Sequence, residues 1–345
     1  MSIKLRAVRL KLWFGTSVVL TAAVLSGRGE VTRDYALDHP APGSIRFTWI
    51  YGSIASATNR DPRIQVQGYN EDTYLMRENL AIHWEGPFTY LLFGNDRALL
   101  IDTGATPESK YYPLRDTVDS LIKRWCKVRG KTDVPLTVVL TSAEDIAQNQ
   151  AYAQFAGRPN TTLAPLALAE AKKFFGLSDT WPTGTATLDL GGRVVTVLPT
   201  PGTHKDGLSF YDPYTAFLFS GDFIFPGRIL IANDKDYLAS VNRLQGFVAQ
   251  QPVKWIMGGH LEMTNLPGVD YPRRTTFKPT ERLLQLEPAT IDEVAKYAAS
   301  TMGQSEIAVR SDFILMNRVG PGARALTRPP DLPPVPATPA IRPRP

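Results

Sequence analysis

The chain has 345 residues, of which 43% are hydrophobic and 21% charged, so it is long enough for one large globular domain. Its formal charge of +5 arises at the two ends, since basic and acidic residues nearly balance between residues 27 and 327, and this excludes the basic surface of a typical nucleic-acid-binding protein. Cys126 is the single cysteine, which excludes an intramolecular disulfide and a cysteine-rich metal site.

The first 26 residues have the pattern of an export signal. A basic start, with Lys4 and Lys11 at its ends, precedes an apolar run over residues 12–25. A run of this length is typical of a secretory signal and is short for a membrane span, which needs about 20 apolar residues. We therefore expect an exported protein, periplasmic or secreted. The alternative is an uncleaved signal that anchors the chain in a membrane.

Residues 27–86 read as an N-terminal β-type extension, and residues 87–320 as the main domain. The extension contains two β-type pieces at 45–50 and 64–67. The main domain opens with a hairpin whose strands span 88–94 and 97–102, around the turn residues Asn95 and Asp96. An amphipathic helix is predicted at 111–128. The continuous apolar run at 136–140 is typical of an inner strand covered on both faces.

The same alternation of strands and helices continues toward the C-terminus. Two short apolar runs flank the turn residues Asp212 and Pro213, which predicts a second hairpin. Residues 328–345 are rich in proline and are expected to form a disordered tail. The remaining predictions are strands at 151–155, 185–190, 193–198, 208–211, 216–219 and 253–257, and helices at 166–175, 236–249 and 290–299.

Four blocks, in order and at fitting distances, resemble the metallo-β-lactamase-fold hydrolases. They are the hairpin at 90–104 ending in Asp102-Thr103-Gly104, Pro201-Gly202 before a strand, Phe219-Ser220-Gly221-Asp222, and Trp255-Ile256-Met257-Gly258-Gly259-His260. The resemblance implies a mixed α/β fold, the αββα sandwich, in which two mixed β-sheets are flanked by helices. In the family, the aspartate that matches Asp102 supports the active-site loops.

The histidines of the family's metal motif are missing. The family binds one or two metal ions, usually zinc, through H-x-H-x-D-H after an inner strand, with a histidine after Pro-Gly, an aspartate and a last histidine. Residues 141–149 contain no histidine. Starting the motif at Thr141 keeps its aspartate as Asp145, and starting it at Ser142 or Ala143 restores no histidine either.

The remaining family positions are partly filled. Thr203 follows Pro201-Gly202, and His204 comes one residue late, an offset that turns a side chain the other way in an extended segment. Asp222 and His260 stand where family ligands stand. One imidazole with one or two carboxylates is a poor catalytic zinc site. The candidate pocket residues are His260, Asp222 and His204, with Thr203, Ser142, Glu144, Asp145 and Asp102 around them; Asp222, His260 and Asp145 are the metal ligands if a metal is retained.

Three functions remain open. The first is a non-catalytic pseudo-hydrolase without a cofactor, which binds a small molecule or a partner in the inherited pocket. The second is a hydrolase of an ester, amide, lactone or thioester, with a remodelled mononuclear zinc site. The third is metal-free chemistry with His204 or His260 as the base. We expect no nucleic-acid partner, and membrane contact only through an uncleaved N-terminal segment.

Overall fold

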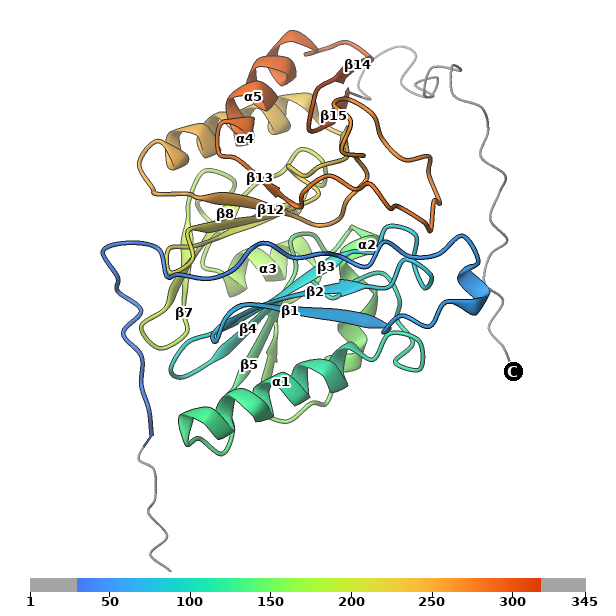
Figure 1. Ribbon diagram of the computed structural model, residues 1–345. Coiled ribbons are helices and arrows are strands. Elements are labelled where there is room, and N and C mark those ends of the chain that lie inside the picture. Colours follow the sequence, from blue (N-terminus) through green and yellow to red (C-terminus); the bar gives the residue numbers. More distant parts are fainter. Residues whose placement is uncertain (1–29, 318–345) are drawn as a thin grey trace, which may run out of the picture.

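Two six-stranded β-sheets lie face to face in the computed structural model, with helices on the outer side of each (Figure 1). The structure describes residues 30–317. The predicted export signal at 1–26 and the predicted tail at 328–345 lie outside the described residues. The order of the layers confirms the predicted αββα sandwich of two mixed sheets.

The first sheet follows the chain from one edge to the other. Its first four strands are antiparallel neighbours, and its last two are added in parallel. Because the fifth strand runs parallel to the fourth, both end at the same side of the sheet. The family's metal motif begins at the end of the fifth strand. The strands are β1 (Ile64–Asn70), β2 (Thr73–Glu78), β3 (Phe88–Phe93), β4 (Ala98–Ile101), β5 (Leu136–Val139) and β6 (Thr161–Leu163).

The second sheet contains the other two sequence blocks that carry the resemblance. Its central strand pair, β10 (Phe217–Gly221) and β12 (Trp255–Gly258), is parallel, so the residues after both strands meet at one edge. The other neighbours are antiparallel: β13 (Gln285–Leu286) beyond β12, then β9 (Leu208–Asp212), β8 (Val194–Pro199) and β7 (Ala186–Asp189) beyond β10. A small third sheet has the order β11 (Arg228–Ile231), β15 (Ile314–Asn317), β14 (Glu306–Val309).

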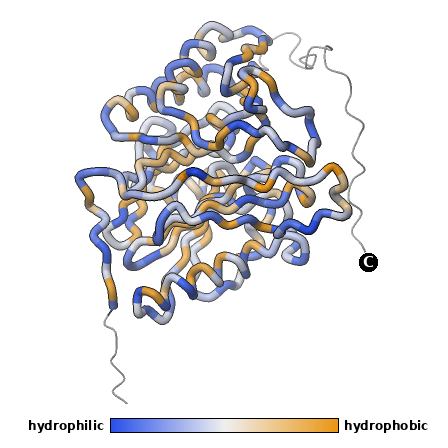
Figure 2. The backbone as a smooth tube through the Cα atoms, in the orientation of Figure 1, coloured by the Kyte–Doolittle hydropathy of each residue, from blue (hydrophilic) through white to orange (hydrophobic). Residues whose placement is uncertain are grey.

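Three apolar clusters separate the four layers, and the hydrophobic segments of Figure 2 concentrate in the strands. The central cluster fills the space between the sheets. Helix α1 (Leu114–Arg129) covers the first sheet with buried side chains spaced three and four apart, and it ends at Gly130, whose φ is 70°. Helices α4 (Asp234–Val248) and α5 (Thr290–Ser300) cover the second sheet. The short helices are α2 (Ile146–Asn149) and α3 (Leu168–Phe174).

Two predicted strands are wrong. Residues 45–50 form no strand, because the Gln65 side chain takes up backbone groups of this segment: Gln65 Oε1 accepts from Ile50 N (2.7 Å), and Nε2 donates to Thr48 O (2.9 Å). Residues 151–155 lie in the 3₁₀ helix η2 (Gln150–Phe155), whose buried Ala151 and Phe155 have helical spacing.

The predicted boundary between 86 and 87 cuts through the first sheet, since β2 pairs with β3. Within residues 30–317, no helix is long and apolar enough to span a bilayer.

A buried arginine joins the two sheets. Arg193, directly before β8, donates to the Asp212 carboxylate through Nε (3.0 Å) and Nη2 (2.6 Å). The same guanidinium reaches the first sheet, where Nη1 donates to the carbonyl oxygens of Asp72 (2.8 Å) and Phe93 (3.0 Å), and Nη2 to Thr73 Oγ1 (2.9 Å). Both charged side chains are fully buried. The cost of burying this ion pair is therefore offset by hydrogen bonds that exist only while the two sheets are packed together.

Arg193→Met is expected to lower the free energy of unfolding by about 3–5 kcal/mol, because it leaves the Asp212 carboxylate buried without a counter-charge. Denaturant unfolding monitored by tryptophan fluorescence measures the loss. The matched control is Arg115→Met, which breaks a half-exposed pair with Asp119 and is expected to cost less than about 1 kcal/mol. Equal losses in the two variants would contradict this role of Arg193.

Candidate functional site

A cavity of about 620 Å³ lies where the loops after the central strands of the two sheets meet. The loop after β5, the Pro201-Gly202 loop, the end of β10 and the end of β12 all contribute to it. Enzymes and binding proteins commonly place their sites at such strand ends. The side chains that line the cavity include Glu85, Asp145, Ile146, Thr203, His204, Asp222, Phe225, Arg228, His260, Glu262 and Arg273.

His260 is buried between two carboxylates. Its Nδ1 lies 3.1 Å from Asp222 Oδ1, at ion-pair distance but without hydrogen-bond geometry, and its Nε2 lies 3.7 Å from Glu262 Oε1. Burial disfavours the charged imidazole, but the charges of Asp222 and Glu262 outweigh burial and raise the pKa of His260 well above its usual value. The imidazole is therefore a cation near neutral pH, which makes it a poor general base.

The carboxyl groups of Asp145 and Asp222 influence each other's ionisation. Asp145 caps helix α2, where its Oδ1 accepts from Ala147 N (2.8 Å), and its carboxyl group contacts that of Asp222. Burial, and then the charge of Asp222, raises the pKa of Asp145 well above its usual range. Burial also opposes ionisation of Asp222, but His260 outweighs it, so the pKa of Asp222 is lowered. Asp145 is therefore the protonated partner and Asp222 the ionised one.

Gln148 completes this group and was not among the predicted site residues. Its fully buried side chain donates from Nε2 to Asp222 Oδ1 at 3.0 Å. A Cβ atom at Gly259 would lie 2.1 Å from that nitrogen and 2.6 Å from Asp222 Oδ1, so glycine at this position lets the amide reach the carboxylate. The signal in the sequence was the spacing of Gln148, three residues after Asp145, which places both on one side of a helical turn.

The structure places Asp102 behind the cavity rather than in its lining. Asp102 follows β4 with φ of 64°, and its carboxyl group accepts from Thr141 N (2.7 Å) and Thr141 Oγ1 (2.9 Å). Burial raises the pKa of Asp102 to about 8. The contact fixes the first residue of the segment in which the family carries its metal motif.

Ser142 and Glu144 connect two loops next to the cavity without lining it. Ser142 Oγ donates to Asp206 Oδ1 (2.6 Å), and Glu144 N donates to Asp206 Oδ2 (3.2 Å). The Glu144 carboxylate pairs with the exposed Lys205 at 2.6 Å. Asp206 was not among the predicted residues, although its buried carboxylate joins the segment after β5 to the Pro201-Gly202 loop.

Thr203 and His204 both line the cavity, so His204 lies where a pocket residue was expected despite its offset of one residue. The segment is a turn and not an extended strand, since Gly202 N donates to His204 O at 3.0 Å and Gly202 has φ of 145°. The charge of His204 also contributes to the lowered pKa of Asp222. The structure therefore brings His204, Asp145, Asp222 and His260 together at one cavity.

These donors do not fit a catalytic metal ion. Within residues 30–317, no group of three or more His, Cys, Asp or Glu side chains is arranged to hold one. The physical reason is that the candidates contact one another: both nitrogens of His260 face carboxylates, and Asp222 Oδ1 is already occupied by Gln148. A catalytic zinc site usually has three protein ligands and an open position.

Comparison with known proteins agrees with the sequence blocks. Residues 125–262 match the family model of the metallo-beta-lactamase superfamily, which confirms the resemblance. The acyl-coenzyme A thioesterase MBLAC2 of Gallus gallus is 31% identical over 80 residues, which are 22% of this chain and 29% of that protein, so the match spans less than a third of that relative.

Two solved structures are similar at low identity. A metallo-beta-lactamase from Pontibacter korlensis has 18% identity and a TM-score of 0.44, over 68% of this chain and 99% of that chain. The metallo-beta-lactamase FIM-1 from Pseudomonas aeruginosa, in its mono-zinc form, has 15% identity and a TM-score of 0.45, over 70% of this chain and 97% of that chain.

Asp222→Asn is expected to lower the pKa of His260, because it removes the closest of the negative charges that raise it. The ring protons of the chain's four histidines can be followed by NMR as the pH is varied. In the variant, His260 is expected to titrate closer to the usual histidine value of about 6.5. Asp206→Asn is the control, since Asp206 binds Ser142. An unchanged His260 titration in Asp222→Asn would refute the ion pair.

Proposed function

Because this chain carries a divergent metallo-β-lactamase superfamily domain, we propose that it is an exported protein whose pocket binds a small molecule without metal-dependent hydrolysis. The observation that carries the proposal is the group formed by Asp145, Asp222, Gln148, His260 and Glu262. Its carboxylates are compensated by protons on Asp145 and His260 and by a hydrogen bond from the Gln148 amide.

The charges of the pocket carboxylates are balanced differently here than in the family. In the family, a metal dication compensates for the aspartate charges. Here the His260 cation lies between Asp222 and Glu262, and Asp145 keeps its proton. Glu262 also pairs with Arg228, whose backbone nitrogen donates to Glu262 Oε2 at 2.7 Å. A metal ion would have to displace these partners. Because the buried carboxylates already have them, the absence of a metal ion costs the site little free energy.

The rest of the cavity supports ligand binding. Its volume of about 620 Å³ lies within the range of small-molecule sites. The Ile146 side chain is 70% exposed beside the cavity, and Phe225 and Leu230 add apolar surface. Thr203 and the exposed Arg273 add polar groups to the lining. A ligand with an apolar body and a polar or anionic group suits this combination.

The second candidate is a hydrolase with a remodelled mononuclear metal site. It is favoured by the convergence of Asp145, Asp222 and His260 on one cavity. The relative named as an acyl-coenzyme A thioesterase makes coenzyme A thioesters a reasonable test substrate. Such a site would require His260 to lose its proton and to turn one nitrogen away from its carboxylate neighbours.

Metal content separates the two candidates. Zinc, iron and manganese are measured per chain after gel filtration of the wild type, with Asp222→Ala and His260→Ala as site variants. We expect wild-type metal no higher than in either site variant. His39→Ala, which changes an exposed histidine outside the cavity, is the control for adventitious binding. Close to one metal per wild-type chain, lost in both site variants and kept in the control, would replace the proposal by the second candidate.

Ligand binding is tested by thermal shift with a panel of acyl-coenzyme A thioesters, lactones and carboxylic acids. A true ligand is expected to raise the melting temperature of the wild type and to lose this effect in Ile146→Asp, because a charge would then occupy the apolar wall. Val128→Asp is the matched control, since Val128 is equally exposed on α1 and lies outside the cavity. Turnover of any of these compounds that depends on added zinc would contradict the proposal.

A further inference from the structure

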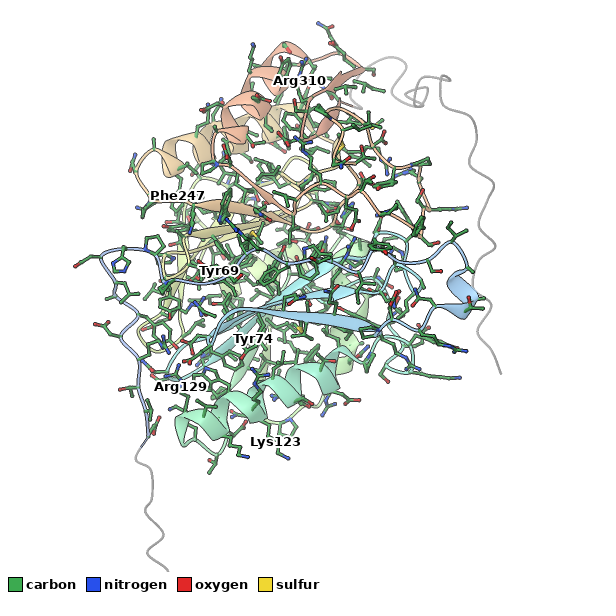
Figure 3. The ribbon with its side chains drawn as sticks, viewed as in Figure 1. Tyr69, Tyr74, Lys123, Arg129, Phe247 and Arg310 are labelled. Atoms are coloured by element: carbon green, nitrogen blue, oxygen red, sulfur yellow. The ribbon has the colours of Figure 1, made fainter. Side chains whose placement is uncertain are left out.

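The C-terminal half of helix α1 presents a basic surface that the pocket does not use. Lys123, Arg124 and Lys127 are exposed on it, and Figure 3 shows Lys123 on the side of α1 that faces away from the sheet. None of the three forms an ion pair with another residue of the described chain. Val128 lies beside them and is 62% exposed. We call these four residues the α1 basic surface.

A groove of about 910 Å³, lined by both polar and apolar residues, adjoins this surface. It separates α1 from the first two strands and is lined by Ile64, Val66 and Tyr74 on the sheet, and by Arg124 and Val128 on the helix. The acidic residue at its edge is Glu71, whose carboxylate already pairs with Arg33 and Arg129. The surface therefore combines positive charge with one exposed apolar side chain, that of Val128.

The chain enters the described structure at this same place. Val31 N donates to Arg129 O, the last residue of α1, at 3.0 Å, and Glu30 pairs with Lys131 just beyond the helix. The described chain therefore begins beside the C-terminal end of α1, as Figure 1 shows.

In the sequence, the apolar run at 12–25 ends shortly before Val31. Leu25 and Val31 are six residues apart, so an extended chain spans at most about 22 Å between them. If the N-terminal segment stays in a bilayer as an anchor, the end of α1 cannot be farther than that from the membrane surface. A connection of this length lets the basic side chains come within the roughly 10 Å over which anionic headgroups attract them, where each contributes about fivefold to binding.

We propose that the α1 basic surface faces the membrane and binds anionic phospholipid headgroups when the N-terminal segment is retained as an anchor. The domain then lies against the bilayer through α1. The helices on the opposite outer layer, α4 and α5, point away from it (Figure 1). This inference goes beyond the proposed function, because it uses no residue of the cavity.

The test uses the full chain reconstituted in vesicles, with a fluorescent label on a cysteine introduced at Val128. The native Cys126 is buried, so the new cysteine is labelled selectively. Quenching by a lipid that carries a headgroup quencher reports contact. We expect several-fold stronger quenching in vesicles with phosphatidylglycerol than in pure phosphatidylcholine. The effect is expected to be lost in Lys123→Glu/Arg124→Glu/Lys127→Glu, and a label at Asn242→Cys on α4 is expected to stay unquenched in both lipids.

Two results would overturn the inference. One is equal quenching at Val128 in both lipids or in the charge-reversed variant, with each protein folded by circular dichroism. The other is cleavage of the N-terminal segment during export, together with failure of the released domain to bind phosphatidylglycerol vesicles. Duplex DNA is included as a competitor, and displacement of the label signal by DNA at physiological salt would assign the surface to nucleic acid instead. None of these outcomes depends on ligand binding in the cavity.

Discussion

Buried charge is the constraint on which this fold and its pocket depend. Between the sheets, the Arg193 guanidinium is matched by the Asp212 carboxylate and by three acceptors of the first sheet. At the other end of the β9–β10 hairpin, Asp222 enters the cavity, where His260, Gln148 and the proton on Asp145 match its charge. In both places a buried charge has partners from more than one part of the fold, so the packing of the layers and the charge balance support each other.

This charge balance explains how a metallo-β-lactamase-like pocket can persist without its usual histidines. A pocket with several carboxylates and no counter-charge would be costly to bury. The structure supplies one cation, His260, between Asp222 and Glu262, and a second cation, Arg228, behind Glu262. If the family motif is started at Thr141, its histidine positions carry Thr141, Ala143 and Ile146. Thr141 hydrogen-bonds to Asp102, and Ile146 forms part of the apolar cavity wall.

Much of the fold was predictable from local sequence patterns, because hairpins, amphipathic helices and the blocks around Asp222 and His260 depend on neighbouring residues. The failures have a common cause. Residues 45–50 have strand-like side chains, but Gln65 binds their backbone groups from a distance in the sequence. The orientation of His204 depended on a turn set by Gly202, and the role of Gln148 depended on Gly259, a residue of the other sheet. Long-range contacts of this kind have no local signature.

The same contacts show why one substitution would not restore a family-type metal site. A histidine at position 146 would add an imidazole at the cavity wall, but His260 would still have both nitrogens next to carboxylates, and Gln148 would still occupy Asp222 Oδ1. Metal binding would have to remove the proton of Asp145 and the charge of His260, both of which the site stabilises. Replacing Glu262 would free His260 but would leave the Arg228 charge with Asp270 alone. Ile146, Gln148 and Glu262 are therefore the three positions at which the described arrangement departs most clearly from an open set of metal ligands.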